Sequence, residues 1–462
     1  MLIRNIFKNK NTRASMFYFI GNIFNKGIAF FTIPIFTRLM SVSDYGLVNT
    51  YLSWISILSI IVGLSLGMSI RSAYIDFKDD LDNYISSIFT LSLINFLVSS
   101  FLIIIFSYIF VEEIDIVLVV LCLVQSFFTF ILNSVSIKYM MEMNYVKNTL
   151  LIAVPNFVIA LVSVFILYFA KTTGYYGRIL PYVAFTSLFG GYFLIKYLFN
   201  TQKKINHKYW SYGITLSLPL IFHSLSTNIL SVSDRSFISY YVGTAETGVY
   251  SLVYNVSMVA AVVTTAIESV WIPWFTNKLQ NNNRDDINKN VNIYLGIATL
   301  TMIVILMISP EVLKIMTPPK YWWGIGLIPP VLVSSFLIFL YSISVNLEYY
   351  YKSTKVIALN TIVAAALNLL LNFIFIPEYG SIGAAYTTVA SYFILFLLHF
   401  KSARNLDKGL FSFIIYVRPL LLITLSVVLA YIFIEDTKVR WGFAVIILSF
   451  ECFNFYKKYK NV

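Results

Sequence analysis

The chain is a regular series of long apolar segments separated by short polar loops. A helix needs about 20 mostly apolar residues to cross a bilayer, and roughly fourteen such segments fill most of the 462 residues. Their apolar runs are continuous and do not alternate strictly, which favours helices over the strands of a membrane barrel. We therefore expect an all-α, polytopic membrane protein with about 14 transmembrane helices. The predicted spans are 15–40, 46–70, 84–110, 115–137, 148–170, 179–199, 212–240, 246–272, 291–310, 325–348, 356–377, 381–400, 412–434 and 441–457.

The distribution of Lys and Arg predicts how these spans are oriented. Most of the 33 basic residues fall in the two terminal segments and in alternate loops, whereas the intervening loops are short and often acidic, as at 112–115. Cytoplasmic loops are enriched in Lys and Arg, so we expect both termini in the cytoplasm. The net charge of +12 then reflects topology, with membrane lipids as partners and no nucleic acid.

Two short motifs recur at nearly the same distance along the chain and indicate an internal duplication. Asp44-x-Gly46 returns as Glu246-x-Gly248, and Tyr176-Gly177-x-Ile179 returns as Tyr379-Gly380-x-Ile382. Six spans separate the copies, so the two halves have the same orientation and are expected to be related by a pseudo-two-fold axis along the membrane normal. We predict an N-terminal six-helix lobe at 1–205, a C-terminal six-helix lobe at 206–405, and an additional helix pair at 406–462.

Polar side chains lie at equivalent places in the first span of each predicted lobe. On the first span they are Asn22, Asn25 and Lys26, and on the seventh they are Ser224, Thr227 and Asn228. The spacing puts each set on one helix face, and Asp234 and Arg235 follow further along the seventh span. Intramembrane charges usually face a bundle interior or water. We expect a hydrated cavity between the lobes, although such Asn, Ser and Thr residues also form plain interhelical hydrogen bonds, and Asp234 and Arg235 equally fit structural ion pairs.

Several functional classes leave no trace in the sequence. There is no G-x-x-x-x-G-K-[ST] loop for ATP, and no His-Glu-x-x-His motif or Cys/His cluster for a metal. No large outer loop collects acids and bases for glycosyl chemistry. We therefore expect neither an enzyme nor a bound cofactor or metal.

Two segments resemble the bacterial polysaccharide-repeat-unit flippases, which belong to the MATE-like multidrug/oligosaccharidyl-lipid/polysaccharide exporter superfamily. The first runs from Ser15-Met16-Phe17 through Asn22, Lys26, Pro34 and Thr37-Arg38-Leu39 to Asp44-Tyr45-Gly46. The second runs from Tyr350-Tyr351-Lys352 through Asn360, Asn368 and Asn372 to Ile376-Pro377-x-Tyr379-Gly380-x-x-Gly383-Ala384-Ala385.

This resemblance implies an O-antigen (lipopolysaccharide) or capsule flippase in the bacterial cytoplasmic (inner) membrane. It would move an undecaprenyl-pyrophosphate-linked oligosaccharide by alternating access, with polysaccharide polymerase and assembly proteins as further partners. The expected substrate-cavity residues are Lys26, Asn22, Asn25, Asn228, Thr227, Ser224, Arg235 and Asp234. Two alternatives remain: a cation-coupled multidrug exporter of the same superfamily, which favours acidic cavity residues, and a membrane glycan polymerase or ligase, which needs a large outer loop.

Overall fold

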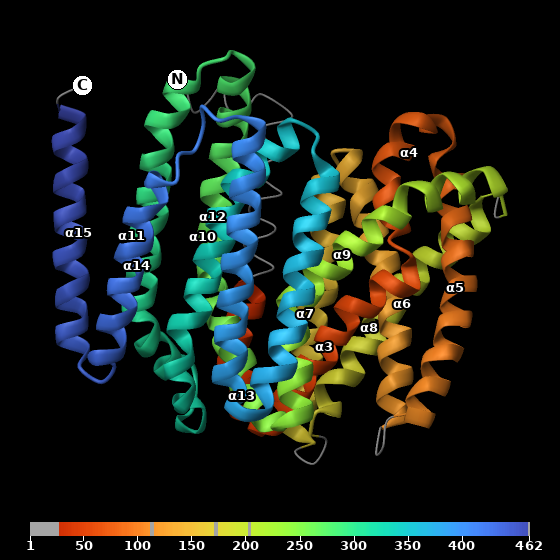
Figure 1. The fold of residues 1–462 in the computed structure, drawn as a ribbon. Coiled ribbons are helices and arrows are strands. Elements are labelled where there is room, and N and C mark those ends of the chain that lie inside the picture. The colour runs from red at the N-terminus through yellow and green to blue at the C-terminus, as the bar shows by residue number, and fades with distance from the viewer. Residues whose placement is uncertain (1–26, 111–114, 171–173, 202–204, 461–462) are drawn as a thin grey trace. The chain divides into compact units, whose positions relative to one another are not determined.

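The computed structural model describes residues 27–110, 115–170, 174–201 and 205–460. Throughout these ranges the chain is helical and contains no strand (Figure 1). Eleven of the described helices are long and apolar enough to cross a membrane, and Gly27–Leu39 forms a shorter apolar helix. When α13 is divided at its kink, every predicted span contains a helix of the described ranges. The predicted fold class, an all-α polytopic membrane protein, is confirmed.

The chain divides into two compact units at Ser236 and Phe237, here called unit 1 and unit 2. Unit 1 contains Gly27–Leu39, α3 (Val42–Gly63), η1 (Leu66–Ser69), α4 (Ile70–Asp76), η2 (Lys78–Asp80), α5 (Leu81–Phe110), α6 (Ile116–Met141), α7 (Tyr145–Phe169), α8 (Tyr176–Asn200) and most of α9 (His207–Tyr241). Unit 2 contains α10 (Thr244–Gln280), α11 (Arg284–Met316), η3 (Pro319–Leu327), α12 (Ile328–Tyr350), α13 (Thr354–Leu406), α14 (Ile414–Ile432) and α15 (Thr437–Lys460). The lobe boundary expected at 205/206 stays a prediction.

Polar residues at the helix starts explain where several of these elements begin. The Asp115 carboxylate accepts the N–H of Val117 at 3.0 Å at the start of α6. Asn144 and Asn283 accept main-chain N–H groups in the same way at the starts of α7 and α11. Such caps satisfy N–H groups that have no partner inside the helix.

In unit 1, α6 packs between α3 and α8, and the span predicted at 46–70 is not a continuous helix. The α-helix ends at Gly63, and Leu64 and Ser65 both adopt left-handed backbone conformations with φ of 49° and 50°. The side chain of Asn95 on α5 donates to the main-chain carbonyls of Ile61 at 2.9 Å and Val62 at 2.8 Å. Carbonyls freed by a helix break need such partners where water is scarce. The break is therefore stabilised by a polar side chain of another helix.

Gly63 is required at this break because the ring of Phe130 on α6 lies directly against it. A Cβ atom at position 63 would overlap the Phe130 ring. The absence of a side chain lets α6 approach the end of α3 closely, as small residues do at other membrane helix interfaces.

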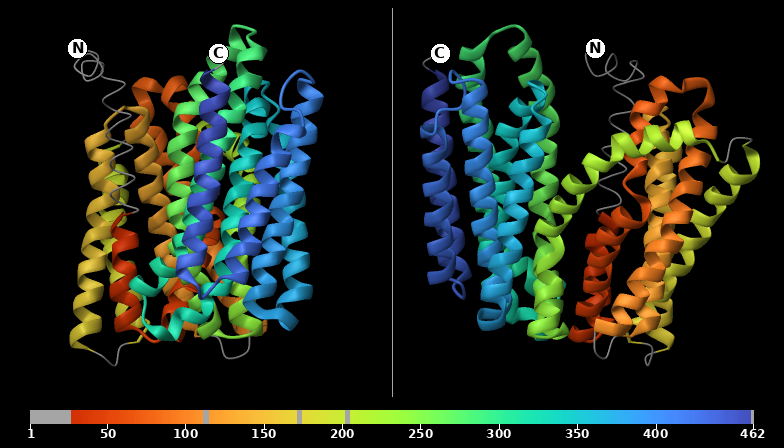
Figure 2. Two further views of the ribbon diagram at one scale, coloured as in Figure 1. Left: turned by 90° about the vertical axis from the view of Figure 1, so that its left-hand side faces the viewer. Right: turned by 45° about the vertical axis from the view of Figure 1, so that its right-hand side comes forward.

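In unit 2, α12 packs against α13, and α11 packs against α10, α14 and α15. Both views of Figure 2 show α14 and α15 side by side as a helical hairpin. A buried pair joins α12 to α13, where Glu348 Oε2 lies 2.8 Å from His399 Nδ1. Helix α13 bends at Gly380, whose φ of 58° and ψ of −140° are not helical.

The same contact occurs once in each unit, and we call it the carboxylate–amide contact. Asp44 and Glu246 are each the third residue of their helices, α3 and α10. Asp44 Oδ1 accepts the N–H of Tyr175 at 3.2 Å, next to Gly174 with φ 52°. Glu246 Oε1 accepts the N–H of Ser381 at 2.6 Å, next to Gly380 with its left-handed φ.

This geometry explains one of the repeated motifs and changes the register of the other. The acids of Asp44-x-Gly46 and Glu246-x-Gly248 have the same role. Gly177, which the sequence match pairs with Gly380, lies inside α8, and the turn glycine of unit 1 is Gly174. The Tyr-Gly match therefore pairs residues with different backbone roles.

Removal of either carboxylate is expected to destabilise its unit. Glu246→Ala leaves the Ser381 N–H without its charged acceptor, and we expect a loss of about 1–3 kcal/mol in the free energy of unfolding. Thermal unfolding of the purified protein in detergent measures the effect, and Asp44→Ala should behave in the same way. Glu378→Ala, an acid just before the same kink, serves as control, and equal stability of Glu246→Ala and this control would contradict the prediction.

Candidate functional site

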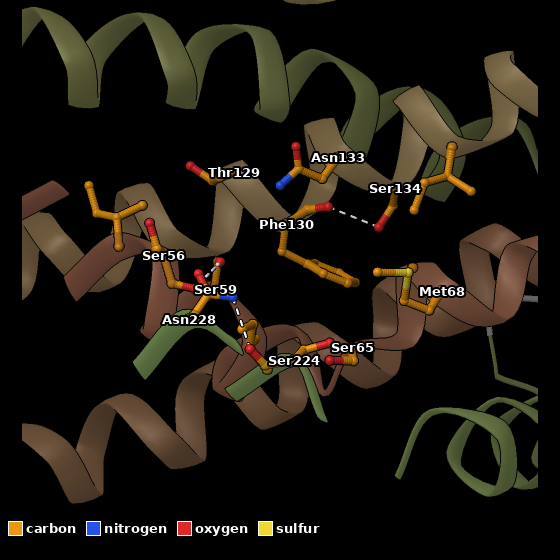
Figure 3. A pocket seen from close by; sticks show the side chains of 14 residues that line it. Ser56, Ser59, Ser65, Met68, Thr129, Phe130, Asn133, Ser134, Ser224 and Asn228 are labelled. Atoms are coloured by element: carbon orange, nitrogen blue, oxygen red, sulfur yellow. Dashed lines mark hydrogen bonds between the residues drawn. The ribbon is translucent and has the colours of Figure 1, made fainter. Parts of the chain in front are cut away.

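A pocket of about 330 Å³ lies inside unit 1, at the break between α3 and α4 (Figure 3). It is lined by residues of α3, η1, α6 and α9 and by Ser65 of the break. The lining residues are Ile55, Ser56, Ser59, Ile60, Ser65, Gly67, Met68, Thr129, Phe130, Asn133, Ser134, Ile137, Ser224 and Asn228. Eight of the fourteen carry a hydroxyl or amide side chain, and none of these described residues is charged.

Helical periodicity brings the polar side chains to the pocket in sets. Thr129 and Asn133 are one turn apart on α6 and lie on one side in Figure 3. Ser59 of α3 and Asn228 of α9 lie across from them. Residues spaced by three or four share a helix face, so each helix presents a short polar stripe to the same space.

The pocket residues differ in how their hydrogen bonds are used. Ser59 donates to the main-chain carbonyl of Ser56 at 3.2 Å, and Ser134 donates to that of Phe130 at 2.9 Å. Their hydroxyl oxygens can then still accept. The side chains of Thr129 and Asn133 have no hydrogen-bond partner within the described part of the chain. Among the described residues, nothing occupies the donors and acceptors of these two side chains.

Of the predicted site residues on α9, the structure brings two to the pocket. Ser224 and Asn228 line it, and the Asn228 amide donates to the Ser224 carbonyl at 2.9 Å. Thr227 is exposed, does not line the pocket, and donates to the His223 carbonyl at 2.8 Å. Two of the three residues expected on one face of α9 therefore line this pocket.

The remaining predicted site residues are not part of this pocket as described. Asp234 is buried, at 2% exposure, and Arg235 is half-buried further along α9. Asn22, Asn25 and Lys26 lie outside the described residues. The expected cavity between the two lobes stays a prediction.

Most of the pocket residues were missed by sequence reasoning. Ser56, Ser59, Thr129 and Asn133 are uncharged, and an uncharged polar residue in an apolar span is a weaker sign of a site than a charged one. Their spacing of three and four within apolar spans is a signal that could have revealed them. Ser65 could not be found in this way, because its position depends on the break in the helix.

Comparison with known proteins places the chain in a family. Residues 12–279, more than half of the chain, match the family described as polysaccharide biosynthesis protein. The chain belongs to this family. The chain is also similar to protein 1 of the Lsg locus of Haemophilus influenzae. The two are 24% identical over 404 residues, which cover 83% of this chain and 97% of that protein.

Two solved structures share the fold of this chain. The lipid II flippase MurJ, in an inward closed conformation, gives a TM-score of 0.71 at 15% identity, covering 96% of this chain and 99% of that one. An inward-facing multidrug resistance MATE family transporter of the MOP superfamily gives 0.59 at 15% identity, with 83% and 96% covered. The family match bears out the predicted resemblance to polysaccharide-related membrane proteins, and these two structures show that the chain shares its fold with a flippase and a transporter.

Proposed function

We propose that the protein is a flippase that moves a lipid-linked oligosaccharide across the cytoplasmic membrane of a bacterium. The substrate would be an undecaprenyl-pyrophosphate-linked repeat unit of O-antigen or capsule. The observation that carries the proposal is the polar pocket at a helix break, in a chain of the polysaccharide biosynthesis family. Membrane transporters bind substrates where discontinuous helices expose irregular backbone and polar groups inside the bundle.

The proposed mechanism is alternating access by the two predicted lobes, 1–205 and 206–405, with the helix pair at 406–462 as an addition. Lys26, together with Asn22 and Asn25, would receive the pyrophosphate, because a cation attracts phosphate strongly where water is scarce. Ser224, Thr227 and Asn228 would contact the substrate from α9, near Asp234 and Arg235. The polyprenyl tail would stay in lipid throughout, which avoids any need to enclose it.

We further propose how the chain is oriented in the membrane and which proteins act after it. The Lys and Arg distribution supports cytoplasmic N- and C-termini. The polymerase and assembly proteins that consume the repeat unit would act on the opposite face of the membrane. Consumption of the product there would supply a direction to transport without ATP.

Deletion of the gene, followed by complementation, tests the function. We expect the deletion strain to lose surface polysaccharide and to accumulate lipid-linked repeat units on the cytoplasmic leaflet, with both defects repaired by the intact gene. Growth on cationic drugs is measured in the same strains as the matched readout. Intact surface glycan together with altered drug tolerance would contradict the flippase function and favour a multidrug exporter.

A further inference from the structure

The pocket in unit 1 has a chemical character more specific than a general cavity for a lipid-linked glycan. Its donors and acceptors are hydroxyl and amide groups from three helices and from Ser65 at the break, and the charged groups expected for a phosphate are not among its described lining residues. Hydroxyl and amide groups recognise other hydroxyl and amide groups, each able to donate and accept. The pocket therefore matches an uncharged, polyhydroxylated ligand.

The hydrogen-bonding groups that have no partner among the described residues lie where such a ligand would meet them. Asn133 is exposed and can offer two N–H donors and a carbonyl, and Thr129 offers a hydroxyl one turn away (Figure 3). Opposite them, Asn228 uses one amide hydrogen for the Ser224 carbonyl and keeps its carbonyl oxygen. A sugar ring with hydroxyls on its rim could bond to both sides at once.

The rest of the pocket is apolar and fits the C–H faces of a sugar ring. Met68, Phe130 and Ile137 line it together with Ile55 and Ile60. Small-molecule pockets are mostly apolar with a few placed polar groups, at about 300–1,000 Å³. At the lower end of that range, this pocket holds a single ring or two and not a whole repeat unit.

The lack of charge among the described lining residues favours a neutral ligand over an anionic one. A carboxylate or phosphate bound here would lose water without gaining an opposite charge from the described lining residues, which is strongly unfavourable. A neutral hexose or N-acetylhexosamine exchanges its hydrogen bonds with water for hydrogen bonds with the protein and meets no such penalty.

We propose that this pocket is a sugar subsite that selects an uncharged glycosyl residue of the transported oligosaccharide. The inference rests on the proposed function for the identity of the whole substrate. It assigns the glycan to Thr129, Asn133, Ser59 and Asn228, and it separates glycan recognition from binding of the charged pyrophosphate.

Binding of simple glycosides to the purified full chain in nanodiscs tests the subsite. The probes are methyl β-glucopyranoside, methyl N-acetyl-β-glucosaminide, methyl β-glucuronide and inorganic pyrophosphate. Their binding is measured by saturation-transfer NMR in titrations. We expect saturable binding of the two neutral glycosides, at least tenfold weaker binding of the glucuronide, and no displacement of the glycosides by pyrophosphate.

Two double variants test whether the glycosides bind in this pocket. The double variant Thr129→Val, Asn133→Leu should weaken binding of the neutral glycosides at least tenfold. The matched double variant Asn281→Leu, Thr424→Val changes exposed residues of unit 2 and should bind like wild type. Size-exclusion chromatography shows that both variants are folded.

Three outcomes would overturn the subsite: no saturable binding of neutral glycosides, glucuronide binding as tight as theirs, or wild-type binding by the pocket variant. These failures are distinguishable from failure of the proposed function. Loss of surface polysaccharide on gene deletion without glycoside binding removes the subsite and leaves the flippase. Glycoside binding in a protein whose deletion leaves the surface polysaccharide intact removes the flippase and leaves a binding site for neutral sugars.

Discussion

Replacement of Arg440 by methionine is expected to destabilise the α14–α15 hairpin by about 3 kcal/mol, the lower end of the range for breaking a buried ion pair from one side, because the partner Glu311 is partly exposed. Arg440 is 1% exposed. Its guanidinium donates to the main-chain carbonyls of Met307 at 2.8 Å, Phe433 at 3.0 Å and Ile434 at 2.6 Å, and forms an ion pair with Glu311. Methionine preserves apolar bulk but removes the guanidinium donors from three carbonyls and from the Glu311 carboxylate, which keeps only the Thr437 hydroxyl and the Trp441 N–H.

The effect is measured as the midpoint of thermal unfolding in detergent, together with the yield of monodisperse protein. Arg440→Lys should be intermediate, because it keeps the charge and loses the planar fork of donors. Lys438→Met removes an exposed cation two residues away and should change stability by no more than about 0.5 kcal/mol. Equal stability of Arg440→Met and Lys438→Met would show that this network does not hold the hairpin.

Exchange of Lys26 for glutamine should abolish most of the surface polysaccharide without reducing the amount of protein in the membrane. Lys26 is the deepest charge of the predicted first span, and its proposed partner is the pyrophosphate of the substrate. A charge-assisted hydrogen bond to such a group is worth about 1.5–3 kcal/mol, which corresponds to roughly a tenfold or greater loss of affinity. Lys26→Arg keeps the positive charge and should be partly active.

Complementation of the deletion strain, with immunoblots for protein level, is the measurement. Lys208→Gln is the control, because Lys208 is exposed beside the loop between α8 and α9 and should leave the surface polysaccharide unchanged. Wild-type polysaccharide in the Lys26→Gln strain would remove this residue from the mechanism.

The positions of the helices could be predicted because hydrophobicity dominates in a membrane. The boundary expected between 377 and 381 is one example, where the structure has the kink of α13 at Gly380. Helix ends were less predictable, since polar turns extend beyond the apolar core, as in α10, which continues to Gln280. Hydropathy reports the lipid-facing part of a helix and not its full length.

The break after α3 could not be predicted, because neither Leu64 nor Ser65 favours a left-handed backbone. The conformation depends on Asn95 from α5 and on the Phe130 ring against Gly63, both distant in sequence. The pocket could not be predicted for the same reason, because the break in the helix places Ser65, Gly67 and Met68 in its wall. Its Thr129 and Asn133 could have been inferred from spacing, whereas their position opposite α9 depends on tertiary packing.

The carboxylate–amide contact has a consequence for how the two halves of such a chain diverge. Its acceptor is an acidic side chain, but its donor is a main-chain N–H, which every amino acid except proline supplies. Tyr175 and Ser381 illustrate this tolerance, since one side chain is large and aromatic and the other is small, and both donate only through the main chain here. The loops that carry the donor can therefore change in sequence without losing this hydrogen bond, so a predicted duplication of this kind is better sought in hydrogen-bond geometry than in residue identity.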